Sequence, residues 1–178
     1  MDSTNLKVPE SVTFEDAIAA TQSLLVQMEE GKLTEREIQE SIESLVRSQN
    51  GARGFFVTYL TDDRTIADAP SVGVVNALKI APEIVGDLLV KNLAMSAAMS
   101  ITHRRNNDEK MAEKSDRVTK RNNFLIERAN LETVLEKLTK MRVSSLTGEG
   151  EYQEFFKRWG YDEEQKQVIA KVLSENIK

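Results

Sequence analysis

The sequence predicts an all-α fold, a multi-helix bundle of about seven helices, and three observations support this. Charged residues make up 30% of the 178-residue chain and aromatic residues only 6%, whereas β-strands are enriched in aromatic and β-branched residues. Only three prolines interrupt the chain. Apolar residues recur at helical spacing over most of the length, and the stretch from about Pro82 to Thr102 is almost wholly apolar.

The first two predicted helices are short and carry clear end signals. Thr13 can cap the first helix, which Gly31 ends by taking a left-handed conformation. Thr34 and Glu37 have the spacing of a capping box at the start of the second helix. We expect that second helix to end at Asn50–Gly51.

Residues 54–60, GFFVTYL, form the one segment whose composition also suits a β-strand. Its only available partner strand is 72–75, and an isolated hairpin of two strands is marginally stable. We therefore predict a short helix that buries Phe55, Phe56, Tyr59 and Leu60. A further helix is expected to open near Pro70 and Ser71 and to run through Ile80.

The apolar stretch 82–102 is predicted to be a buried central helix. Pro82 suits a first helical turn because its missing N–H is not needed there. The stretch is long enough to span a membrane, but Asp87 and Lys91 lie within it and would be costly in hydrocarbon. The prediction is a core helix and no membrane contact.

After Thr102 the composition becomes strongly charged. Between His103 and Asn123 the only apolar residues are Met111, Ala112 and Val118, so a helix there has no wide face to bury. A heptad-like seam then resumes, and we interpret it as a candidate association surface. Its residues are Phe124, Leu131, Val134, Leu138 and Met141.

The C-terminal region is predicted to be a loop followed by two helices. Residues 144–151, SSLTGEGE, have the composition of a loop. A short helix ending before Gly160 would place Tyr152, Phe155, Phe156 and Trp159 near one face. Asp162 and Gln165 have capping-box spacing at the start of the last helix.

These elements predict one domain with an appendage. Residues 1–12 have no periodicity and are expected to be a flexible lead-in, and 13–178 a single helical domain. Within that domain, 103–142 would form a long charged helix or helical hairpin, a partly projecting arm.

No catalytic, cofactor or metal motif of any strength is present. The chain contains no cysteine and a single histidine, His103, without the partners of a hydrolytic triad or a zinc site. Its one Gly-Lys pair, Gly31-Lys32, lacks the remainder of a phosphate-binding loop. We therefore predict a protein that is not an enzyme and that has no cofactor.

The charge distribution nevertheless indicates one candidate contact surface. Residues 101–142 carry eleven basic and seven acidic side chains, against four basic and ten acidic in 1–50. On a continuous helix four basic residues share one stripe, with two arginines at its start, and such a stripe could follow a phosphate backbone. The six candidates are Arg104, Arg105, Lys110, Lys114, Arg117 and Arg121. Acidic residues on the neighbouring face favour a solvated or protein-binding surface instead.

The function predicted from the sequence is a non-catalytic interaction or regulatory module that binds itself, as a homodimer, or another protein through the charged arm and seam. The first residues lack the features of a secretory signal, which favours a cytoplasmic location. The alternative is a nucleic-acid or polyanion binder that uses the basic stripe at 104–121. A third hypothesis is a small-ligand pocket beneath Met95, Met99, Tyr59 and Trp159. Core packing explains the apolar character of these four residues more simply.

Overall fold

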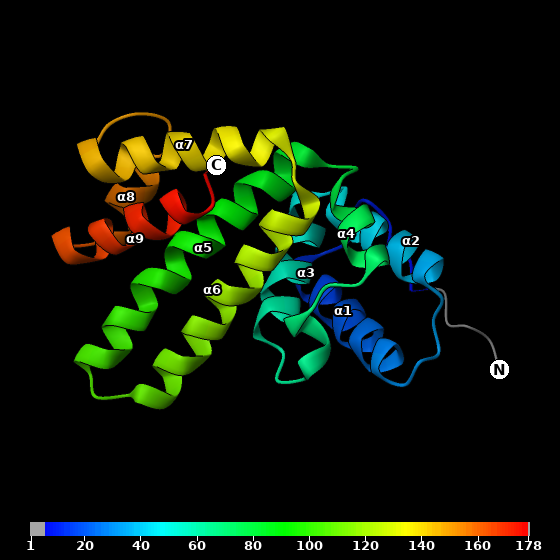
Figure 1. The fold of residues 1–178 in the computed structure, drawn as a ribbon. Helices are drawn as coiled ribbons and strands as arrows, with labels where there is room; N and C mark the ends of the chain where they lie inside the picture. Colours follow the sequence, from blue (N-terminus) through cyan, green and yellow to red (C-terminus); the bar gives the residue numbers. More distant parts are fainter. Residues whose placement is uncertain (1–5, 178) are drawn as a thin grey trace. The chain divides into compact units, whose positions relative to one another are not determined.

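The computed structural model describes residues 6–177, and over this range the protein is all-α, with no β-strand (Figure 1). Residues 6–177 form nine α-helices and one short 3-10 helix, more than the seven or so predicted. The α-helices are α1 (Phe14–Glu29), α2 (Glu35–Val46), α3 (Gln49–Thr61), α4 (Val72–Leu78), α5 (Pro82–Arg105), α6 (Glu109–Ala129), α7 (Glu132–Thr147), α8 (Gln153–Trp159) and α9 (Glu163–Glu175). The 3-10 helix η1 is Thr65–Asp68.

Two compact units make up the chain, Met1–Leu88 and Leu89–Lys178, and α5 begins in the first and ends in the second. The buried side chains along α5 include Val85, Leu89 and Leu93, none of which exposes measurable surface. The predicted core helix therefore extends one turn further than expected, to Arg105.

In the first unit α1 packs closely on α3, and Gly54 makes this close approach possible. A Cβ atom at Gly54 would lie 2.5 Å from the Cβ of Ala17 and 2.9 Å from the carbonyl oxygen of Phe14. α2 packs on α4, where the backbone N–H of Gly73 donates to the carboxylate of Glu35 at 2.6 Å. The lack of a side chain at Gly54 and at Gly73 thus allows α1 to pack closely on α3 and α2 on α4.

The segment 54–60 is helical, as predicted, and Phe55, Phe56, Tyr59 and Leu60 are all at most 2% exposed. The helix begins earlier than expected, however. Ser48 is its N-cap and accepts from the N–H of Gly51 at 3.1 Å, so Asn50–Gly51 lies in the first turn of α3 and does not end α2.

The predicted lead-in, 1–12, falls partly outside the described residues. From residue 6 onward it contacts the first unit: the N–H of Val8 donates to the hydroxyl of Ser44 at 3.0 Å, and Lys7 forms an ion pair with Glu40 at 3.1 Å. Val12 is 5% exposed. This part of the lead-in is thus held by specific contacts.

In the second unit the segment 103–142, predicted to be a long helix or a helical hairpin, is divided at two breaks between α5, α6 and α7. Asn107 and Asn130 both take left-handed backbone conformations, with φ of 58° and 47°. Asparagine tolerates this conformation better than most residues, and here it ends α5 and α6. Ser144–Thr147, expected to be loop, is the last turn of α7, which Gly148 ends.

Candidate functional site

A series of polar contacts joins the second part of α5 to α6 as an antiparallel helical hairpin. The hydroxyls of Ser96 and Thr119 lie 2.7 Å apart, and one turn further along α5 the hydroxyl of Ser100 donates to Asp116 at 2.6 Å. Arg104, another turn on, donates to Asp116 at 2.7 Å and to Glu109 at 2.9 Å. The polar residues along this part of α5 therefore face the partner helix within the chain.

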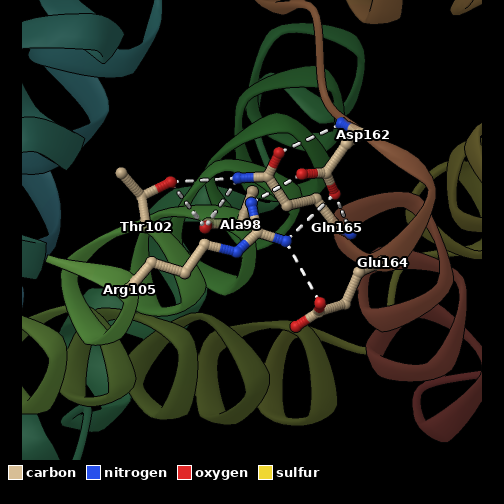
Figure 2. Close-up of polar contacts among 6 residues, drawn as sticks. All are labelled: Ala98, Thr102, Arg105, Asp162, Glu164 and Gln165. Carbon is tan, nitrogen blue, oxygen red and sulfur yellow. Dashed lines mark hydrogen bonds and ion pairs between the residues drawn. The ribbon is translucent and has the colours of Figure 1, made fainter.

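Arg105 joins the end of α5 to the start of α9 (Figure 2). Its guanidinium donates to the two carboxylate oxygens of Asp162 at 2.5 and 3.3 Å and to Glu164 at 3.1 Å. Asp162 is also the N-cap of α9 and accepts from the N–H of Gln165 at 3.0 Å. One carboxylate thus both caps a helix and binds an arginine from another.

Gln165 completes this contact from a buried position, 8% exposed. Its side-chain amide donates to the carbonyl oxygen of Ala98 at 3.2 Å and to the hydroxyl of Thr102 at 3.0 Å, while its oxygen accepts from the N–H of Asp162 at 3.1 Å (Figure 2). The capping box predicted from the sequence is confirmed. Through the side chain of Gln165, this capping box also holds α9 against α5.

The ion pairs shift the pKa values of both carboxylates. Arg105 is the main cause of the lowered pKa of Asp162, and Arg104 is the main cause of the lowered pKa of Asp116. A carboxyl group whose pKa is lower in the folded state stabilises the fold above its unfolded pKa, near 4, and loses that contribution as the pH falls through the folded value.

We therefore expect Asp162→Asn to reduce the dependence of stability on pH. Asparagine remains a good N-cap, so the variant removes the ion pair and keeps the capping acceptor. Urea unfolding at pH 7 should show a lower midpoint for the variant than for the wild type, and the two should converge towards pH 2. A difference that stays constant over this range would contradict the role of the charge.

The structure does not present the six predicted basic residues as one free stripe. Arg104 and Arg105 are neutralised within the chain, as described above. Arg121 is 2% exposed, which corrects the expectation that it lies on the surface. Arg117 is half-buried and has contacts of its own. Of the six predicted residues, only Lys110 and Lys114, one turn apart on α6, are exposed and have no ion pair among the described residues.

The predicted association seam is also largely inside the molecule. Val134, Leu138 and Met141 are at most 1% exposed, and the helix that carries them, α7, packs against α9. Phe124 and Leu131 are half-buried. We call Val134, Leu138 and Met141 the inner seam, because they form an intramolecular core and are not available to a partner.

A second row of α7 side chains is uncharged and lies on a neighbouring face of the helix, at an angle to the inner seam. Leu135, Thr139, Val143 and Leu146, here called the outer stripe, follow one another at intervals of four, four and three residues and so share one helix face. Val143 is 48% and Leu146 59% exposed. The Thr139 hydroxyl donates to the Leu135 carbonyl oxygen at 3.1 Å and so is satisfied within α7.

Sequence reasoning missed this stripe although its spacing was visible. The sequence predicts a loop over 144–151, which includes Leu146, and the predicted heptad-like seam contains neither Leu135 nor Val143. The signal that could have revealed it is the regular recurrence of uncharged residues at 135, 139, 143 and 146.

A cavity of about 290 Å³ lies in the second unit, between the end of α6, the start of α7 and the end of α9. Its lining does not include Met95, Met99 or Trp159, around which a ligand pocket was hypothesised, and both Met99 and Trp159 are exposed. Glu127, which interrupts the predicted heptad, is one of its lining residues.

Metal binding and membrane insertion are two further possibilities for the part of the chain that the structure describes. No group of histidine, aspartate and glutamate side chains there is arranged to hold a metal ion. α5 is long and apolar enough to cross a membrane by length and composition, a test that buried core helices also pass, and 61% of its most apolar window is buried.

Comparison with known protein families gives a match over most of the chain. Residues 13–176 match the model of the family described as "Uncharacterised conserved protein UCP020893". No curated protein and no solved structure matches the chain significantly.

Proposed function

This chain belongs to the UCP020893 family, and we propose that it is a non-catalytic cytoplasmic helical module that associates with a second copy of itself through the outer stripe of α7. The observation that carries the proposal is the exposure of Val143 and Leu146, two large apolar side chains about one turn apart in an uncharged row. Contiguous apolar surface of this kind marks interaction sites more often than scattered apolar residues do.

The charges beside the outer stripe support pairing between identical helices. Glu132 and Glu136 are exposed near its N-terminal half, and Arg142 is exposed near its C-terminal half, where Lys140 forms an ion pair with Glu151 at 3.0 Å. When two copies of α7 pack in antiparallel orientation, the acidic half of one faces Arg142 of the other. Such complementary charge favours this orientation, and a twofold pair is the commonest form of homo-oligomer.

Light scattering across a range of protein concentrations tests the proposal. The wild type should increase in mean molar mass from monomer towards dimer, whereas Leu146→Lys should stay monomeric because a lysine would place charge within an apolar contact. The matched control is Met111→Lys on α6, which also introduces a lysine at an exposed apolar position, 39% exposed. The control should behave like the wild type.

Two results would contradict the proposal. A wild type that remains monomeric at every concentration removes self-association, and equal loss of dimer in Leu146→Lys and Met111→Lys removes the assignment to α7. The polyanion alternative is tested in the same instrument with a generic DNA duplex. A duplex-dependent increase in mass at low salt that disappears in Lys114→Gln would favour that alternative.

A further inference from the structure

The cavity in the second unit has an apolar wall and a charged wall. Its apolar side chains come from the end of α6 and the start of α7. They are Ile126, Leu131, Val134 and Leu135. The cavity volume, about 290 Å³, is at the small end of the range for ligand sites in proteins, so it suits a short chain of a few carbon atoms.

Two carboxylates, Glu127 on α6 and Glu175 on α9, line the same cavity from elements far apart in the sequence. Neither forms an ion pair with any residue in 6–177. The charged wall is therefore negative and is not neutralised by a described side chain.

The ends of two helices add to this negative character. Asn130 is the C-cap of α6 and Asn176 the C-cap of α9, and both line the cavity. The C-terminal end of a helix carries partial negative charge on its free carbonyl groups and favours cations. The N-terminal end of α7, whose N-cap Leu131 also lines the cavity, carries the opposite partial charge, so the preference for a cation rests on the two carboxylates together with the two C-terminal helix ends.

The carboxamide of Asn176 can offer only an acceptor to a ligand. Its nitrogen donates to the Asn123 side-chain oxygen at 2.8 Å and to the Val172 carbonyl oxygen at 3.0 Å, which uses both hydrogens. Its oxygen remains available to accept a hydrogen bond. An anion finds no basic side chain in the lining, whereas a donor finds several acceptors.

We propose that this cavity binds a small aliphatic amine. The alkyl chain would lie on the apolar wall, and the ammonium group would lie between Glu127 and Glu175 and donate to their carboxylates. An ammonium group has three donors and no acceptor, which matches a lining of carboxylate and carboxamide oxygens. The inference goes beyond the proposed self-association and does not depend on it.

The test uses n-hexylamine with the full-length protein in calorimetry, and 1-hexanol and hexanoate as ligands of equal chain length without the positive charge. We expect hexylamine to bind at least about tenfold more tightly than hexanol, because the charge-assisted contacts are lost in the alcohol. The double variant Glu127→Gln/Glu175→Gln should weaken hexylamine binding by about tenfold or more. The control Glu113→Gln, an exposed glutamate of α6 outside the cavity, should bind like the wild type.

The side-chain amide signals of Asn123, Asn130 and Asn176 locate the ligand by NMR, since all three residues line the cavity. They should shift with hexylamine in the wild type and not in the double variant. No binding, equal affinity for hexanol, or unchanged affinity in the double variant would each overturn the proposal.

The side chain of Lys178 also carries an ammonium group. This residue follows Asn176 by two positions in the sequence and lies outside the described residues. The variant Lys178→Ala distinguishes the two sources. Equal hexylamine binding in wild type and variant supports a ligand from solution. Binding that occurs only in Lys178→Ala would mean that the cavity serves the chain's own lysine and would overturn the proposal.

Discussion

Leu138→Ala is expected to lower the free energy of unfolding by about 2–5 kcal/mol, the usual cost of removing a large buried aliphatic side chain and leaving a cavity. Leu138 is 0% exposed on the face of α7 that packs against α9. Because that contact lies within one chain, the loss should be the same at every protein concentration. Urea unfolding at two concentrations that differ by about a hundredfold checks this.

The comparison variant is Leu146→Ala, which makes the same chemical change on the same helix at a position that is 59% exposed. It should change the stability of the dilute, monomeric protein by no more than about 0.5 kcal/mol. If Leu138→Ala had no effect in dilute solution and a large effect in concentrated solution, the inner seam would be an interface between chains, contrary to the structure.

Gly54→Ala is expected to destabilise the first unit, although alanine is a better helix former than glycine by about 1 kcal/mol. The added Cβ would lie 2.5 Å from the Cβ of Ala17 and 2.9 Å from the carbonyl oxygen of Phe14, so α1 and α3 must move apart. Overpacking of this kind costs about 1–3 kcal/mol. Thermal or urea unfolding should show a clear decrease in the midpoint.

A compensating variant makes this prediction specific. Ala17→Gly removes the nearest atom and costs about 1 kcal/mol by itself, because it places a glycine inside a helix. The double variant Ala17→Gly/Gly54→Ala should be more stable than the sum of the two single changes implies. Additive effects, or a Gly54→Ala protein more stable than the wild type, would contradict the close helix crossing.

The helices were largely predictable because their signals are local. The capping boxes of Thr34 with Glu37 and of Asp162 with Gln165 both form, since each depends on residues three positions apart. The helical state of 54–60 followed from the absence of a credible partner strand. The break at Asn130 was not predicted, because asparagine is common in other conformations too and nothing in its neighbours requires a left-handed residue there.

The candidate site was predicted less well because its contacts join distant residues. Arg105 and Asp162 are 57 positions apart, so a pattern search that reads one segment at a time sees an unpaired arginine. The inner seam has a comparable explanation. A heptad-like spacing predicts that a face is buried against a helix, but it does not specify whether that helix, here α9, belongs to the same chain.

The absence of cysteine from the chain allows a direct test of how the two faces of α7 are used. A single cysteine is introduced at Leu146 or at Leu138, and its rate of reaction with a thiol reagent is measured as protein concentration rises. The proposed use of the two faces of α7 predicts fast labelling of Leu146→Cys in dilute solution that slows as dimers form, and slow labelling of Leu138→Cys throughout. Labelling of Leu146→Cys that does not depend on concentration, or of Leu138→Cys that is fast in dilute solution, would contradict it.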